Sequence, residues 1–122
     1  MAAPRIRQLR RDKTVFSLSL NIIRLHLEEN ELLRQQPHLR EAPDAVMLLV
    51  QQSIDQWVNL AANYIMRKHT CSAGEALQLL GELQAEMKGS IPAAEVGQIP
   101  LNTVLVLPPE LLASQQPAVA EE

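Results

Sequence analysis

Cysteine is almost absent from this sequence of 122 residues, and its scarcity limits how the chain can be stabilised. Cys71 is the single thiol, so no internal disulfide can form. A chain of this length must therefore depend on one hydrophobic core, and a lone cysteine is typical of a reducing compartment. We expect one folded domain in the cytoplasm. The nucleus and the mitochondrion stay open as alternatives, the second because residues 1–20 are rich in Arg and nearly free of acidic residues.

Aromatic residues are also scarce, with one Phe, one Trp and one Tyr in a chain that is 47% hydrophobic. The core must therefore be built from aliphatic side chains. Such cores suit the packing of helix on helix, whereas strand-rich folds draw more on aromatic residues. The composition predicts a mainly α protein, a small helical domain of about three helices.

The sequence contains no motif that is typical of a binding site for a common cofactor. The four glycines fall singly, so no glycine-rich loop is present to hold a phosphate. A zinc site needs three or four ligands, and His26, His38, His69 and Cys71 do not have the spacing of such a set. No apolar run approaches the roughly 18 residues of a membrane span. We expect no cofactor, no metal and no membrane partner.

The residues that could act in catalysis lack the partners that a catalytic site needs. Cys71 precedes a predicted helix and lies near His69, a setting that can lower the pKa of a thiol. A nucleophile also needs an orienting partner and an oxyanion site, and the sequence has no signature of either. The carboxylates of Glu28, Glu29 and Glu31 crowd on one polar helical face instead of forming a pair with separated pKa values. We therefore expect a protein that is not an enzyme.

The net charge of −3 conceals an uneven distribution of charge. Residues 1–13 hold five basic side chains and one acidic one, and the rest of the chain holds six basic and thirteen acidic ones. Such a basic arm binds nucleic acid or an acidic protein surface in many proteins, and the simpler alternative is a solvated terminus. The candidate residues of a nucleic-acid arm are Arg5, Arg7, Arg10, Arg11 and Lys13.

The segment that follows the arm has an ambiguous pattern. Apolar and polar residues alternate from Phe16 to Ile22, which is typical of a strand with one buried face. From Leu25 to Gln36 the chain is rich in Leu, Glu, Gln and Arg, which favour helix. The sequence predicts a short strand near 15–20 and then a helix over about 22–36.

The strongest helical pattern covers residues 45–68. Apolar residues recur there at steps of three and four, and Asp44 stands before them as an N-cap. Trp57, Leu60 and Tyr64 widen the apolar stripe beyond one face. They are either anchors for a protein partner or additional core residues, and the sequence leaves both interpretations open.

A further helix is predicted over residues 73–88 by signals at both of its ends. Ser72 and Glu75 have the spacing of a capping box, and Gly89 is placed to end the helix in the left-handed conformation. These signals divide the chain into a basic arm (1–13), a helical domain (14–89) and a Pro-rich tail (90–122).

Within that tail, residues 101–107 form an apolar segment between two prolines. The segment is either an edge strand that pairs with residues 15–20 or a peptide that lies over the helices without strand pairing. From Ser114 to the end of the chain, the composition predicts disorder.

These features favour a non-enzymatic interaction or assembly protein, such as an adaptor, a chaperone-like accessory or a small subunit of a complex. Its partner is another protein or a second copy of itself, as in a homo-oligomer. The alternative is a dimeric DNA-binding regulator of ribbon-helix-helix architecture, in which the basic arm precedes a strand that enters the major groove. In that case Val15, Ser17 and Ser19 would face the bases.

Overall fold

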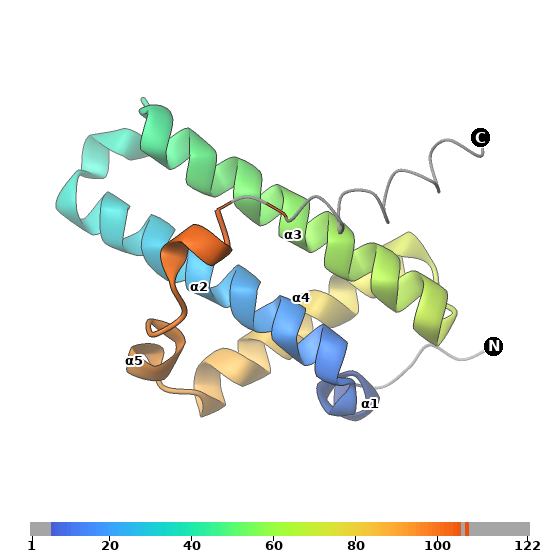
Figure 1. The fold of residues 1–122 in the computed structure, drawn as a ribbon. Helices are drawn as coiled ribbons and strands as arrows, with labels where there is room; N and C mark the ends of the chain where they lie inside the picture. The colour runs from blue at the N-terminus through green and yellow to red at the C-terminus, as the bar shows by residue number, and fades with distance from the viewer. Residues whose placement is uncertain (1–5, 106, 108–122) are drawn as a thin grey trace.

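The protein is a helical bundle in the computed structural model, which describes residues 6–105 and 107. Three helices are long, and they form a hairpin with a third helix packed across one half of it (Figure 1). The mainly α fold predicted from the composition is confirmed. The elements in chain order are α1 (Ile6–Arg11), α2 (Lys13–Gln35), the 3₁₀ turn η1 (Pro37–Arg40), α3 (Ala45–His69), α4 (Ala73–Ser90), the short α5 (Ala93–Val96) and the 3₁₀ turn η2 (Leu101–Thr103).

Helix α2 corrects the prediction of a strand near residues 15–20. These residues lie inside a helix that starts at Lys13, where Asp12 Oδ1 accepts hydrogen bonds from the backbone N–H of Thr14 (3.0 Å) and Val15 (3.3 Å). The apolar residues fall on more than one side of α2, a pattern that suits a helix covered by several neighbours. Helices α1, α3, α4 and α5 all contact α2. Tertiary packing, not strand pairing, therefore explains the alternation.

Helix α3 confirms the predicted central element and extends it by one residue. Asp44 caps its start, with Oδ1 accepting a hydrogen bond from the Met47 N–H at 2.8 Å. The buried stripe continues through Val50, Ile54 and Ile65. The helix ends at Thr70, whose backbone takes the left-handed conformation with φ of 51°.

Helix α4 begins as predicted and ends two residues later. Ser72 and Glu75 form the capping box, with the Glu75 N–H donating to Ser72 Oγ (3.1 Å) and the Ser72 N–H donating to Glu75 Oε1 (2.9 Å). The prediction that Gly89 ends the helix in the left-handed conformation is wrong, because no described glycine has a positive φ. The helix continues to Ser90, whose hydroxyl donates to the carbonyls of Glu86 and Met87, and Pro92 prevents further turns.

The chain after α4 returns over α2 and α3 and completes the core. Arg24 Nε holds this segment on α2 by donating to the Ile99 carbonyl at 2.8 Å. No described residue of 101–107 is in a strand, so the strand prediction is wrong there and the alternative of a peptide lying over the helices is confirmed. Val96, Val104 and Leu107 belong to the hydrophobic core, so the folded part extends past the predicted boundary at residue 89. The predicted disorder from Ser114 lies outside the described residues.

Candidate interaction surfaces

Trp57 and Leu60, two of the predicted partner anchors, lie in the hydrophobic core. The Trp57 side chain is 3% exposed and its indole Nε1 donates a hydrogen bond to the Val104 carbonyl at 2.8 Å. One turn earlier on α3, the Ser53 hydroxyl donates to the Leu105 carbonyl. The returning segment therefore covers this part of α3, and in this conformation neither anchor offers its side chain to a partner.

Tyr64, the third predicted anchor, belongs to a polar cluster at the junction of three helices. Its hydroxyl lies 3.3 Å from both carboxylate oxygens of Asp12. His69 Nε2 and Lys68 Nζ lie 3.1 Å and 3.3 Å from Asp12 Oδ2. Asp12 also caps α2, and its side chain is only 5% exposed. This Asp12 cluster ties the start of α2 to the end of α3.

The electrostatics of the Asp12 cluster fit a structural role. Burial alone would raise the pKa of the Asp12 carboxyl. Hydrogen bonds from the Val15 N–H, His69 and Lys68 lower it by more than burial raises it, so the pKa lies below its ordinary value of 3.8. The carboxylate is therefore ionised near neutral pH and accepts hydrogen bonds from all of these groups. Its acceptor capacity is used within the protein, which leaves little for a substrate.

Cys71 lacks the environment of an activated thiol. Burial, followed by the nearby carboxylate of Glu75, raises the pKa of the Cys71 thiol above its ordinary value of 9.0. The thiol is therefore protonated near neutral pH.

Among the described residues, no group of three His, Cys, Asp or Glu side chains is placed to hold a metal ion. In the same part of the chain, none of the helices is long and apolar enough to cross a membrane.

The predicted nucleic-acid arm is largely helical. Arg5 lies outside the described residues, whereas α1 packs against the domain through the buried Leu9. Arg10 Nη1 forms an ion pair with Glu86 at 2.6 Å, and its guanidinium lies over the Phe16 ring. Arg10 is thus an internal contact between α1, α2 and α4.

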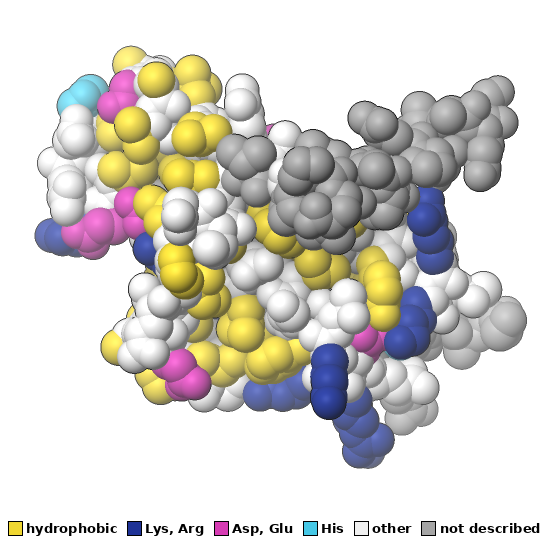
Figure 2. Space-filling view, viewed as in Figure 1, with side chains coloured by type: hydrophobic (Ala, Val, Ile, Leu, Met, Phe, Trp, Pro, Cys, Tyr) yellow, Lys and Arg dark blue, Asp and Glu magenta, His cyan; other side chains and the backbone are white. Residues whose placement is uncertain are grey.

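The other described members of the arm differ from Arg10, since they are exposed and form no ion pair within the described part of the chain. They are Arg7, Arg11 and Lys13. The Asp12 cluster places them at the same end of the molecule as Arg67 and Lys68 of α3. Figure 2 shows Lys and Arg side chains gathered at this end, over α1 and the end of α3.

An apolar surface that the sequence analysis did not identify lies at the opposite end of the hairpin. Val46, Leu48 and Leu49, in the first two turns of α3, are 55%, 44% and 38% exposed. Figure 2 shows hydrophobic side chains over this part of the molecule, to the upper left, where the hairpin extends beyond α4. We call these three residues the hairpin-end patch. Their exposure depends on how α4 crosses the hairpin, a long-range arrangement that no local sequence pattern indicates.

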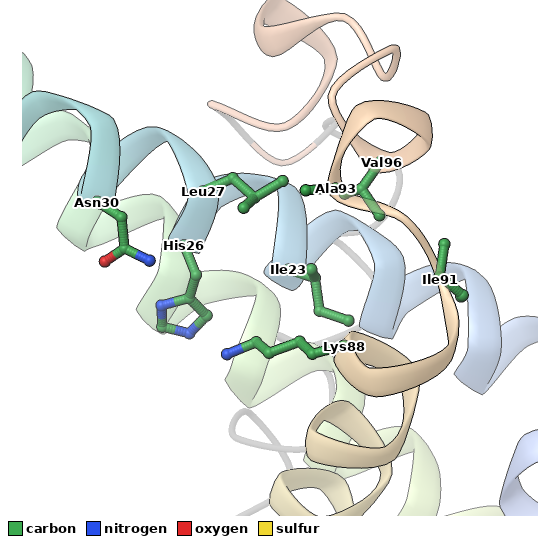
Figure 3. A pocket seen from close by; sticks show the side chains of 8 residues that line it. All are labelled: Ile23, His26, Leu27, Asn30, Lys88, Ile91, Ala93 and Val96. Carbon is green, nitrogen blue, oxygen red and sulfur yellow. The ribbon is translucent and has the colours of Figure 1, made fainter.

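A groove lies between α2 and the chain that links α4 to α5. Figure 3 shows its apolar side chains, with the side chains of His26, Asn30 and Lys88 at one end. The volume of this hollow is about 190 Å³, and its apolar lining is Ile23, Leu27, Ile91, Ala93 and Val96. Burial, and then the positive charge of Lys88, lowers the pKa of His26 below its ordinary value of 6.5.

Comparison of the chain with protein-family models, with curated proteins and with solved structures gave no match.

Proposed function

We propose that the protein is a non-enzymatic assembly protein that associates with a second copy of itself through the hairpin-end patch. The observation that carries this proposal is the exposure of Val46, Leu48 and Leu49 in the first two turns of α3, where Val46 and Leu49 are three positions apart and share one face. Large apolar side chains that are exposed together on a small domain mark an interface more often than isolated ones do.

The polar rim of the hairpin-end patch supports a second copy as the partner. Exposed Arg40, Glu41 and Asp44 precede the patch along the chain, so both signs of charge border the apolar surface. In a two-fold dimer a contact between residue i of one copy and residue j of the other occurs twice, so a rim of mixed charge can pair with itself away from the axis. A rim of one sign would repel its own copy.

Sedimentation velocity over a concentration series tests this proposal. The wild-type protein should dimerise, and Val46→Ser with Leu49→Ser should give a monomer with an unchanged far-UV circular dichroism spectrum. Leu77→Ser is the matched control, because Leu77 is 48% exposed on α4, away from the patch. A wild-type protein that stays monomeric at every concentration, or a dimer that persists in the double variant, would refute the proposal.

The ribbon-helix-helix alternative lacks the strand that it requires, because the residues that would form the ribbon belong to α2. Val15 and Ser19 are buried, so they cannot face bases. Nucleic-acid binding through the basic arm does not depend on that architecture, and it stays open as a separate proposal.

A further inference from the structure

We propose that five cationic side chains at one end of the molecule form a binding surface for the phosphate backbone of duplex nucleic acid. We call this surface the basic corner. It is independent of the hairpin-end patch, which lies at the other end of α3. Its residues are Arg7, Arg11, Lys13, Arg67 and Lys68.

The fold assembles the basic corner from segments far apart in the sequence. Asp12 lies between Arg11 and Lys13 in the chain, and its carboxylate contacts Lys68 and His69 at the end of α3. The Asp12 cluster thereby fixes the junction of α1 and α2 beside the last turn of α3. Arg7 and Arg11 are four positions apart on α1 and therefore share one of its faces. The basic corner is thus a surface whose shape is fixed by the fold. It includes residues of α3, which a terminal arm alone would not contain.

The charges of the basic corner are available to an anion. Arg7, Arg11, Lys13 and Arg67 are exposed and have no ion-pair partner among the described residues, whereas Arg10 is paired with Glu86. Lys68 shares its charge with the buried Asp12 and still keeps a side chain that is 56% exposed. The whole chain carries a net charge of −3, so this cluster of positive charge is opposite in sign to the net charge of the protein. Clustered cations of this kind attract polyanions and bind them by releasing counterions.

The surroundings of the corner favour a duplex over single strands. Single strands are usually held by exposed aromatic rings on which bases stack. Trp57 is buried here, and the half-buried rings of Phe16 and Tyr64 lie beside the cations of Arg10 and Lys68. Contacts between cations and phosphates alone suit a duplex backbone, and they predict binding without sequence preference.

An anionic membrane is less well matched to the basic corner. Stable attachment to a membrane usually combines basic residues with apolar side chains that insert between the lipids. The large exposed apolar residues of the described chain are Val46, Leu48, Leu49 and Leu77, and none of them belongs to the corner. The corner therefore offers charge without an apolar insertion.

Fluorescence anisotropy with a labelled duplex of mixed sequence, in a salt series, tests the proposal on the full chain. Contacts with four or five phosphates should give a slope of about −4 in a plot of log affinity against log salt. Arg7→Gln with Arg11→Gln should make this slope less steep by about 2, and Arg67→Gln alone by about 1. The effect of Arg67→Gln separates a surface built by the fold from a flexible arm, because Arg67 lies on α3.

The matched control removes one exposed cation from the other end of the molecule. Arg34→Gln, in the last turn of α2, changes the net charge as much as Arg67→Gln does, and it should leave the slope unchanged. Circular dichroism should show every variant folded. Val46→Ser with Leu49→Ser should retain duplex binding, so the two proposals fail or succeed separately.

Several results would overturn the assignment to a duplex. These are no binding at low salt, an equal change of slope in the Arg34→Gln control, or an unchanged slope in Arg67→Gln. Tighter binding to single-stranded oligothymidylate, to vesicles with anionic lipid or to polyglutamic acid, the last as a probe for an acidic protein partner, would also contradict it.

Discussion

Asp12 joins the start of α2 to the end of α3 through several polar contacts. Its carboxylate caps α2 and accepts hydrogen bonds from side chains of α3, while almost no water reaches it. A buried carboxylate destabilises a protein without partners and stabilises it with them. The contribution of Asp12 to stability therefore depends on all of its partners being in place. The position of Asp12 in the sequence, inside a run of basic residues, gives no sign of this role.

Replacing Asp12 with Ala should lower the free energy of unfolding by about 1.5–3 kcal/mol, because hydrogen bonds to a charged group are lost and the start of α2 loses its cap. Urea denaturation measures the change. Asp55→Ala is the control, since Asp55 is exposed on α3 and should change stability little. An equal loss in both variants would show that the Asp12 cluster contributes nothing specific.

The contribution of Asp12 should also depend on pH. The folded state lowers the pKa of the carboxyl below 3.8, so the stabilisation is present above that pH and is lost as the pH falls through the folded-state pKa. The stability difference between the wild type and Asp12→Ala should therefore shrink in acid. Denaturation curves between neutral pH and pH 3 measure it, and a difference that grows in acid would contradict the prediction.

His26 should produce a pH dependence in a different range. Its pKa is lowered by burial and by Lys88, so the unfolded chain binds the proton more readily below pH 6.5. Stability should fall as the pH decreases from 6.5 towards the folded-state pKa of His26, and His26→Gln should reduce this fall. His38→Gln, at an exposed position in η1, should retain the wild-type profile. Identical profiles in the wild type and His26→Gln would refute the prediction.

At the scale of whole elements, the capping signals at helix starts were more reliable than the alternation of apolar and polar residues at the start of α2. Asp44, Ser72 and Glu75 mark helix starts in the sequence because capping is a local interaction, and the structure confirms these starts. The start of α2 was missed because Phe16, Leu18 and Leu20 alternate with serines, which imitates a strand when the neighbours of the helix are unknown. Gly89 was misplaced as the end signal because α4 continues to Ser90, whose hydroxyl donates to the carbonyls of Glu86 and Met87 in the last turn.

The capping box of α4 gives a prediction at this scale. Ser72→Ala removes the oxygen that accepts a hydrogen bond from the Glu75 N–H, and it should destabilise the protein by about 0.5–2 kcal/mol. Ser17→Ala, at an exposed position inside α2, should change the free energy of unfolding by a few tenths of a kcal/mol at most. Thermal or urea unfolding of the two variants tests the comparison. Equal effects would mean that the cap does not stabilise α4.

For the whole molecule, composition predicted the class of fold, and it could not predict how the chain closes. An aliphatic sequence with one strong central helix indicates a helical bundle. The burial of Trp57 depends on the return of Val104 and Leu105 over α3, and the exposure of the hairpin-end patch depends on how α4 crosses the hairpin. Both are long-range outcomes, and a single sequence contains no local signal for them.

Closure by the returning segment can be followed with the single tryptophan of the chain. Deleting residues 101–122 removes the carbonyl that accepts the Trp57 indole N–H and uncovers the ring. The emission of Trp57 should then shift to longer wavelength, and the free energy of unfolding should fall because Val104 and Leu107 leave the core. An unchanged emission maximum would show that the segment does not cover Trp57 in solution.

The Asp12 cluster also has a consequence for the order in which the protein folds. Asp12 and His69 are 57 positions apart, and Arg10 and Ser90 are 80 apart, whereas Glu29 and Gln51, which link α2 and α3 nearer the turn between them, are 22 apart. Contacts across long stretches of chain carry a larger loop-closure entropy and form after local ones. Helix α1 and the first turn of α2 should thus dock last in folding and open first in the native state. Amide hydrogens of Thr14 and Val15 should exchange with solvent faster than those in the middle of α3.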